Sequence, residues 1–244
     1  MAAPNALVAR ILAELAGTAA AGVTTRGLDA LAERRIREAG AVPAFKGYRG
    51  YPATLCTSVN EQVVHGIPSD RKLVEGDILS LDMGVLMDGF YGDAALTVGI
   101  GRIAAEAGRL LRVTQEALGA AITQVRVGAR LSDIGHAVQR LVEANGFSVV
   151  REFVGHGIGA ALHEEPQIPN YGEPGRGPRL AEGMVLAIEP MVNAGRAGVK
   201  ILSDGWTAVT KDGSLSAHFE HTVAVTAAGP RVLTTRNGAG TARA

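Results

Sequence analysis

Acidic residues inside apolar, strand-like runs are the feature that most limits how this chain can fold. They lie in the segments LSLDMG, YGDAAL, AIEP and HFEHT, and they are Asp82, Asp93, Glu189 and Glu220. A charged side chain in an apolar run is rarely fully buried unless it is paired. The fold must therefore either turn these carboxylates to solvent or gather them around positive charge.

A glycine-rich segment, GHGIGAALHEEP at residues 155–166, adds an imidazole to these acids. His156 stands between two glycines, which let the backbone approach a ligand closely. The segment lacks the spacing of a phosphate loop, of a dinucleotide fingerprint and of a His-Glu-x-x-His zinc helix. Four carboxylates neutralise two divalent cations, and one imidazole beside them suits Mn, Fe(II), Co or Zn. The residues therefore predict a two-metal centre, while solvent-facing acids are the alternative that the sequence leaves open.

Two predicted strands, residues 77–86 and 90–100, flank Asp88-Gly89, a dipeptide typical of a two-residue hairpin turn. This turn sets Asp82 opposite Ala95, so that Asp82 and Asp93 share one face of the hairpin. Diagonal neighbours lie roughly 7–8 Å apart at the backbone, so their carboxylates can converge on one cation. Without a cation the two aspartates would repel each other, and one would tend to stay protonated.

Helical spacing of apolar residues predicts two pairs of helices. The first pair covers residues 6–17 and 25–39, and the second covers 103–125 and 132–145, with Ser132 as the N-cap of the last helix. Apolar runs with turn signals follow each pair and predict strands. The order of elements is thus the same in both halves of the chain.

The two halves also resemble each other residue by residue. A shift of 106 residues aligns Leu28 with Ile134, and a shift of 107 aligns EGDILSLD with EGMVLAIE, which sets Asp82 on Glu189. We therefore expect an α+β fold of two pseudo-symmetric halves, each with a helix pair and a curved antiparallel sheet. Equivalent acids would then face each other near a pseudo-twofold axis. Chance similarity between amphipathic helices is the alternative.

Composition is that of an ordinary globular protein, with 244 residues, 47% hydrophobic and 20% charged. Lys and Arg equal Asp and Glu at 24 each, so no global charge favours nucleic acid or an anionic membrane. A single cysteine, an N-terminus unlike a signal peptide and the lack of a spanning apolar run favour a cytoplasmic protein. We expect one catalytic domain over residues 1–236 and a disordered tail over 237–244.

Five longer motifs carry a resemblance to a known family. They are GYRGYPATLCTSVNEQVVHGIPSD, LDMGVLMDGFYGD, GHGIGAALHEEPQIPNYG, GMVLAIEPMV and WTAVTKDGSLSAHFEHTVAVT. In this order and at these separations they resemble the type I methionine aminopeptidases, which have the pita-bread fold. The resemblance extends from about residue 4 to residue 230. It implies a metal-dependent hydrolase that removes N-terminal methionine when the second residue is small.

The resemblance also implies roles for individual residues. Asp93 and Glu220 would bridge two divalent ions, with Asp82 on one ion and His156 and Glu189 on the other. Glu189 would also move the proton of the attacking water, and His65 and His163 would contact the substrate and the tetrahedral intermediate. The methionine pocket would be lined by Tyr48, Tyr51, Cys56, Leu162 and Trp206.

Several positions depart from the family pattern. Leu162 stands where an aromatic residue is usual, and His218 stands where glutamine is usual. Hydroxyl residues common beside the ligands are replaced by Ala94, Ala95 and Ala187, which removes possible hydrogen bonds to the ligands.

Three rival functions follow from these motifs. The first two are an Xaa-Pro peptidase of the same fold, which usually has an additional N-terminal domain, and a non-catalytic binding protein, which tends to lose ligands. The third is a weakly active paralogue. The expected substrates are N-terminal methionyl peptides, with nascent chains near the ribosome as a candidate source, and the expected state is a monomer.

Overall fold

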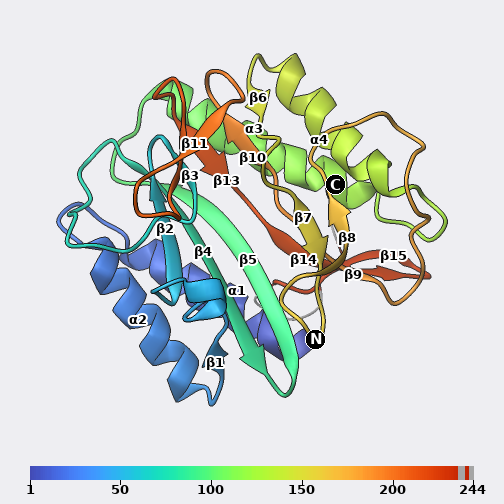
Figure 1. Ribbon diagram of the computed structural model, residues 1–244, viewed down its shortest axis with the longest axis horizontal. Coiled ribbons are helices and arrows are strands. Elements are labelled where there is room, and N and C mark those ends of the chain that lie inside the picture. Colours follow the sequence, from blue (N-terminus) through green and yellow to red (C-terminus); the bar gives the residue numbers. More distant parts are fainter. Residues whose placement is uncertain (236–239, 242–244) are drawn as a thin grey trace.

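A computed structural model gives the structure of residues 1–235 and 240–241 (Figure 1). It combines helices with antiparallel sheets, which confirms the α+β class. The helices form two pairs, each followed by strands, and all begin and end within a few residues of their predicted bounds. They are α1 (Ala2–Thr18), α2 (Thr25–Glu38), α3 (Ala105–Thr123) and α4 (Leu131–Ala144).

The predicted cap of the last helix was wrong. Helix α4 begins one residue before Ser132, and its N-cap is Arg130, whose backbone N–H donates to Asp133 Oδ2 at 3.0 Å. The Ser132 hydroxyl instead accepts from the backbone N–H of Arg176 at 2.7 Å. Serine can bond its own helix or a neighbouring loop, and here the loop packed on the helix start takes it.

The first half contains a four-stranded antiparallel sheet in which β4 pairs with β1, β2 and β5. Its strands are β1 (Val42–Pro43), β2 (Leu55–Val59), β4 (Ile78–Met87) and β5 (Phe90–Gly99). The hairpin register is as predicted, because Asp82 pairs with Ala95 and Asp93 pairs with Gly84. Asp82 and Asp93 therefore lie on one face of the sheet. Asp88 and Gly89 both have positive φ, of 51° and 77°, as a tight two-residue turn requires.

The second half contains two antiparallel sheets, and a third sheet joins the halves. A six-stranded sheet is formed by β7 (Gly155–Gly157), β8 (Glu164–Ile168), β9 (Val185–Ile188), β14 (His221–Thr226), β15 (Gly229–Val232) and β16 (Gly240–Thr241). A three-stranded sheet is formed by β6 (Ser148–Val149), β10 (Met191–Asn193) and β13 (Ser216–His218). The third sheet combines β3 (Gln62–Val64) of the first half with β11 (Val199–Ile201) and β12 (Ala208–Thr210).

Helices α1 and α2 pack on the four-stranded sheet, and α3 and α4 pack on both sheets of the second half, so there are two large apolar cores. Leu28 and Ile36 of α2 are fully buried, and so are their aligned counterparts Ile134 and Val142 of α4. The sequence alignment of the halves therefore corresponds to equivalent packing positions. The four-stranded sheet and the six-stranded sheet turn their other faces toward the middle of the molecule, between the halves (Figure 1).

The halves are joined along β5 and β14. The backbone N–H of Glu220, just before β14, donates to the carbonyl of Ala95 at 2.9 Å. The Thr222 hydroxyl donates to the carbonyl of Asp93 at 2.7 Å, and both partners are buried. These bonds fix the position of one acid of the second half relative to one acid of the first half.

The end of the chain is only partly described. Of the predicted tail, residues 240–241 form β16, which pairs with β15, and the rest of 237–244 lies outside the described residues. None of the helices in the described part of the chain combines the length and apolarity needed to cross a membrane.

Candidate metal centre and substrate pocket

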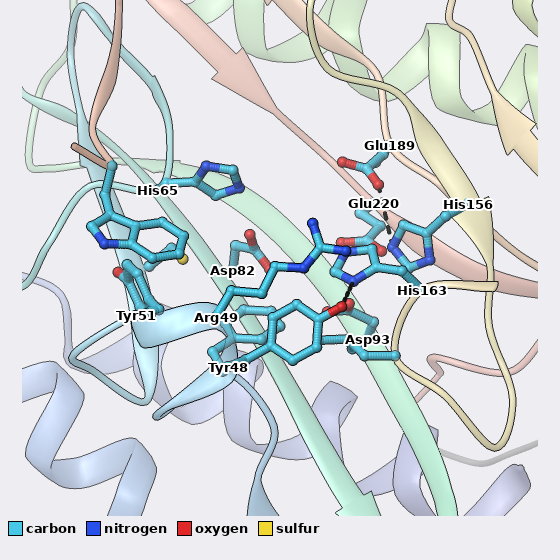
Figure 2. A pocket seen from close by; sticks show the side chains of 14 residues that line it. Tyr48, Arg49, Tyr51, His65, Asp82, Asp93, His156, His163, Glu189 and Glu220 are labelled. Atoms are coloured by element: carbon cyan, nitrogen blue, oxygen red, sulfur yellow. Dashed lines mark hydrogen bonds and ion pairs between the residues drawn. The ribbon is translucent and has the colours of Figure 1, made fainter. Parts of the chain in front are cut away.

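A cavity of about 190 Å³ lies between the halves, and every predicted site residue lines it (Figure 2). These residues are Tyr48, Tyr51, Cys56, His65, Asp82, Asp93, His156, Leu162, His163, Glu189, Trp206 and Glu220. They come from positions spread over most of the chain. The fold therefore unites residues that the sequence could only suggest to be neighbours.

The first half supplies two acids and a thiol from one sheet face. Cys56 of β2 pairs with Asp82 of β4, which pairs with Ala95 of β5, and Asp93 is two residues from Ala95. Side chains two apart on a strand point to the same side. This register brings the carboxylates of Asp82 and Asp93 beside the Cys56 thiol at the floor of the cavity.

The second half also places two candidate ligands as diagonal neighbours, but here they are a histidine and a glutamate. His156 of β7 pairs with Ala187 of β9, and Glu189 follows two residues after Ala187, so His156 and Glu189 are diagonal neighbours. Their side chains meet, with His156 Nε2 3.6 Å from Glu189 Oε1. Pro190, which cannot donate to a strand ladder, comes directly after Glu189.

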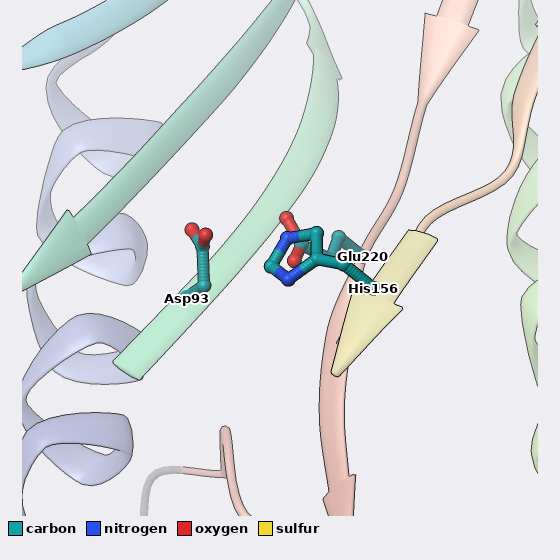
Figure 3. Close-up of side chains that lie close together, drawn as sticks. All are labelled: Asp93, His156 and Glu220. Atoms are coloured by element: carbon teal, nitrogen blue, oxygen red, sulfur yellow. The ribbon is translucent and has the colours of Figure 1, made fainter. Parts of the chain in front are cut away.

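Three of these residues already form a compact cluster of metal-binding atoms (Figure 3). One ligand atom each of Asp93, His156 and Glu220 lies within 4.8 Å of the other two. All three residues are buried, with exposed fractions of 4%, 7% and 3%. Asp93 Oδ1 and Glu220 Oε1 have no hydrogen-bond partner although they are buried. Because buried carboxylate oxygens need a partner, these atoms fit a site for divalent cations.

Burial dominates the electrostatics of the four carboxyls. It raises the pKa of Asp82 to about 7. The pKa values of Asp93, Glu189 and Glu220 are raised well above the usual range by burial and then by neighbouring carboxylates. Burial and mutual repulsion therefore oppose the ionisation of all four acids at once. Bound positive ions would allow all four to be charged.

The His156 ring is oriented for metal binding by its own strand. Its Nδ1 lies 2.9 Å from the carbonyl oxygen of Gly157, so the proton resides on Nδ1 and the Nε2 lone pair faces Glu189. Burial lowers the pKa of His156, and the bond to Gly157 partly opposes this shift. The imidazole is therefore neutral near pH 7, as a metal ligand must be.

Two further histidines line the cavity. His163 stacks near His156, with ring centroids 4.3 Å apart, and its Nδ1 lies 2.8 Å from the Tyr48 hydroxyl. Burial lowers the pKa of both His163 and His65 to about 4. Both are neutral near pH 7 and can each donate or accept one hydrogen bond toward a substrate.

The other end of the cavity is apolar. Tyr51 and Trp206 form an edge-to-face pair with centroids 5.1 Å apart, and the Tyr51 hydroxyl lies 3.1 Å from each of the carbonyl oxygens of Leu55 and Gly66. Burial raises the pKa of the Cys56 thiol well above its usual value, so the thiol stays protonated. Aromatic rings and an uncharged sulfur make a wall suited to an apolar or thioether side chain.

Phe45 and Arg49 also line the cavity, although the sequence motifs indicated no role for either residue. The glycine at position 84 indicates that a large group packs closely there, because a Cβ on residue 84 would lie only 2.8 Å from the Phe45 ring. His218 was noted as a departure; its Nε2 lies 3.8 Å from Glu189 Oε2 and has no hydrogen-bond partner. Leu162 is buried in an apolar cluster with Ile158 and Ala187.

Comparison with known proteins agrees with this site. Residues 1–227 match the model of metallopeptidase family M24. The chain is similar to methionine aminopeptidase of Clostridium perfringens, with 57% identity over 213 residues, covering 87% of this chain and 86% of the relative. It belongs to the methionine aminopeptidases of family M24.

Two other methionine aminopeptidases give the same result. Methionine aminopeptidase 1 of Bacillus subtilis is 54% identical over 213 residues, covering 87% of this chain and 86% of the relative. The crystal structure of methionine aminopeptidase from Thermotoga maritima has a TM-score of 0.95 and 47% identity, covering 96% of this chain and 95% of that one. The predicted family, its pita-bread fold and its hydrolase class are therefore confirmed.

Proposed function

We propose that this methionine aminopeptidase hydrolyses the first peptide bond of chains with a small second residue, at a centre of two divalent cations. Asp82, Asp93, His156, Glu189 and Glu220 would hold the cations. The observation that carries this assignment is the cluster of Asp93, His156 and Glu220, whose buried carboxylate oxygens have no partner in the protein. Mn, Fe(II), Co and Zn all suit such a ligand set.

The bound cations would lower the pKa of a water toward about 7 and offset the charge that develops in the transition state (aminopeptidases are among the worked examples of that principle). The protein's own residues supply the remaining steps. Glu189 would accept the proton of the attacking water and pass it to the leaving amine. His163 and His65 would donate hydrogen bonds to the carbonyl oxygen and to the intermediate.

Tyr48 supports the role of His163. The hydroxyl lies 2.8 Å from His163 Nδ1, so it holds the ring in one orientation while Nε2 stays available to the substrate. The methionine side chain would lie against Tyr51, Cys56 and Trp206 at the apolar end of the cavity, with Leu162 of the neighbouring apolar cluster also lining the cavity. A free N-terminal amine would bind beside the carboxylates, which restricts cleavage to the first bond.

Metal analysis combined with peptide hydrolysis tests this function. Protein loaded with each of the four metals should cleave Met-Ala-Ser, cleave Met-Leu-Ser much more slowly, and leave Leu-Ala-Ser intact. Activity should fall after chelation and return when two metal equivalents are added back. Cleavage of Ala-Pro-Ser in place of Met-Ala-Ser would favour the Xaa-Pro alternative, and metal binding without any hydrolysis would favour a binding protein.

We also propose that the protein acts as a monomer in the cytoplasm on newly made chains. The cavity is formed within one chain, and every residue proposed to act in it is described in this structure. Light scattering of the active protein tests the monomer, because activity that appears only in a dimer fraction would contradict it.

A further inference from the structure

Arg49 is the one cation that lines the cavity among the residues that the structure describes. It belongs to the short 3₁₀ helix η1 (Tyr48–Gly50), and its side chain is exposed. Figure 2 shows it extending from this segment into the region of His163. Arg49 is also close enough to His163 to lower the pKa of that imidazole, after burial and His156 have done so. The guanidinium thus stands where the cavity opens to solvent.

The backbone at Arg49 is strained. Arg49 has φ 50° and ψ 22°, in the left-handed region that non-glycine residues seldom adopt. Its neighbour Gly50 and the nearby Gly47 also have positive φ, of 90° and 87°. Such strain persists where the surrounding structure imposes it, and it often occurs at ligand-binding sites.

The guanidinium keeps its hydrogen-bonding capacity for a ligand. Its Cζ lies 5.5 Å from the centroid of the Tyr48 ring, a contact that orients it without using its N–H groups. Neither an ion pair nor a hydrogen bond to another described residue occupies those groups. Five N–H donors in a planar fork therefore remain available at the opening, and this fork matches a carboxylate.

We propose that Arg49 is a specificity-determining residue that binds a substrate carboxylate beyond the scissile bond, on the third residue or at the chain end of a short peptide. The inference rests on the proposed function, because that function places the substrate's methionine inside the cavity and the following residues at its opening. Arg49 is the one permanently charged cation among the described residues that line the cavity, and its guanidinium lies on the side of the opening.

Matched peptides separate the two sources of a carboxylate. Met-Ala-Glu-amide and Met-Ala-Gln-amide differ in one charge, and Met-Ala-Gln with a free carboxyl end moves that charge to the terminus. We expect kcat/KM about fivefold higher for at least one acidic peptide than for the neutral amide, as for a partly exposed charge-assisted bond. The preference should shrink at 0.5 M salt, where screening extends over only a few ångströms.

Variants of Arg49 give the decisive comparison. Arg49→Gln should reduce the ratio of acidic to neutral substrate to about one, Arg49→Glu should invert it, and Arg49→Lys should retain part of it. Arg109→Gln is the matched control, because Arg109 also lies over an aromatic ring, 4.5 Å from the Phe147 centroid, outside the cavity. This control should keep the preference of the unaltered protein.

Calorimetry with uncleavable reduced-amide analogues of the same peptides measures binding without turnover. The acidic analogue should bind the unaltered protein about fivefold more tightly than the neutral one, and Arg49→Gln should abolish that difference. A ratio of one in the unaltered protein, or a preference that survives Arg49→Gln, would overturn the proposal. Failure of the proposed function would be distinct, since no methionyl peptide would then be cleaved at all.

Discussion

The two halves of the molecule hold their acids in different ways. In the first half, Asp82 and Asp93 lie within an unbroken hairpin in which β4 and β5 pair along their whole length. In the second half, Glu189 follows the last residue of β9 and Glu220 comes between β13 and β14. In the second half, the strand pairing that corresponds to the β4–β5 hairpin is therefore interrupted at both glutamates.

This difference determines how each acid is held in place. An acid within a ladder is fixed by the strands on either side, whereas an acid at a strand break is fixed by individual contacts. Asn170 Nδ2 donates to the carbonyl of Glu189 at 3.0 Å, and the Glu220 N–H donates to Ala95 of the other half at 2.9 Å. The first half thus acts as the platform on which the second half is positioned.

Removal of one proposed acidic ligand from either half should have the largest effect. Asp93→Asn and Glu220→Gln keep the shape of the side chain but remove a charge that the cations need. Each should lower kcat/KM on the order of 10³-fold, or about 4 kcal/mol. Kinetics with Met-Ala-Ser and metal analysis of the same preparations measure the effect. A loss confined to one variant would mean that a single half carries the centre.

Removal of the metal ions should lower the stability of both halves together. Two cations, each at a free concentration of about 100 times its Kd, stabilise the folded state by about 5 kcal/mol, so chelation should lower Tm by about 10–20 °C. Thermal unfolding followed with and without chelator gives this difference. An unchanged Tm would argue against tight cation binding at this site.

The difference in Tm between the metal-loaded and the metal-free protein should grow as pH rises. The pKa of Asp82 is about 7 in the metal-free folded protein, above the usual value of about 4 expected in the unfolded chain. Between these values the folded state binds more protons, so metal-free stability falls as pH rises from about 4 through 7. The raised pKa values of Asp93, Glu189 and Glu220 contribute a fall of the same sign. Asp82→Asn and Glu189→Gln should each flatten this dependence, one variant from each half.

The contact between the halves should show a smaller effect. Thr222→Val removes the hydroxyl that donates to the Asp93 carbonyl at 2.7 Å, which should cost about 1–1.5 kcal/mol of unfolding free energy. If the first half positions the second, metal affinity should also fall about tenfold. Thr114→Val is the matched control, because its buried hydroxyl donates to the Leu110 carbonyl within α3. The control should lose stability while its metal affinity stays the same.

The smallest effect is expected at the far end of the hairpin. Gly89 has φ 77° and open space around it, so Gly89→Ala meets only backbone strain and should cost about 1 kcal/mol. Asp88→Gly, at φ 51°, should not destabilise the protein. Denaturant unfolding measures both variants. A large loss of peptide hydrolysis in Gly89→Ala would show that the hairpin does not act as a rigid platform.

The same contrast explains what the sequence predicted. The hairpin of the first half was predicted in detail, because Asp88-Gly89 fixes the turn and the turn fixes the register of Asp82 and Asp93. The strand breaks at Glu189 and Glu220 were not predicted, because they depend on contacts between residues far apart in the sequence. The resemblance supplied residues of the cavity that no local pattern indicates.

Two failures have a physical cause. Arg49 was overlooked because an arginine in a glycine-rich turn usually faces solvent, and no local pattern indicates that this one lines the cavity. The cap at Ser132 was wrong because a side chain that can serve a helix start was taken by a loop from later in the chain. Local patterns fail where a residue has two possible partners and tertiary structure selects one.

The division of ligands between the halves has a practical consequence. A cut in the connection at residues 101–104, between β5 and α3, would leave two fragments, each with its own helix pair, sheet and apolar core. Asp82 and Asp93 would remain on one fragment, and His156, Glu189 and Glu220 on the other. Neither fragment alone could cleave peptides, so recovered hydrolysis after mixing would serve as a reporter of fragment association.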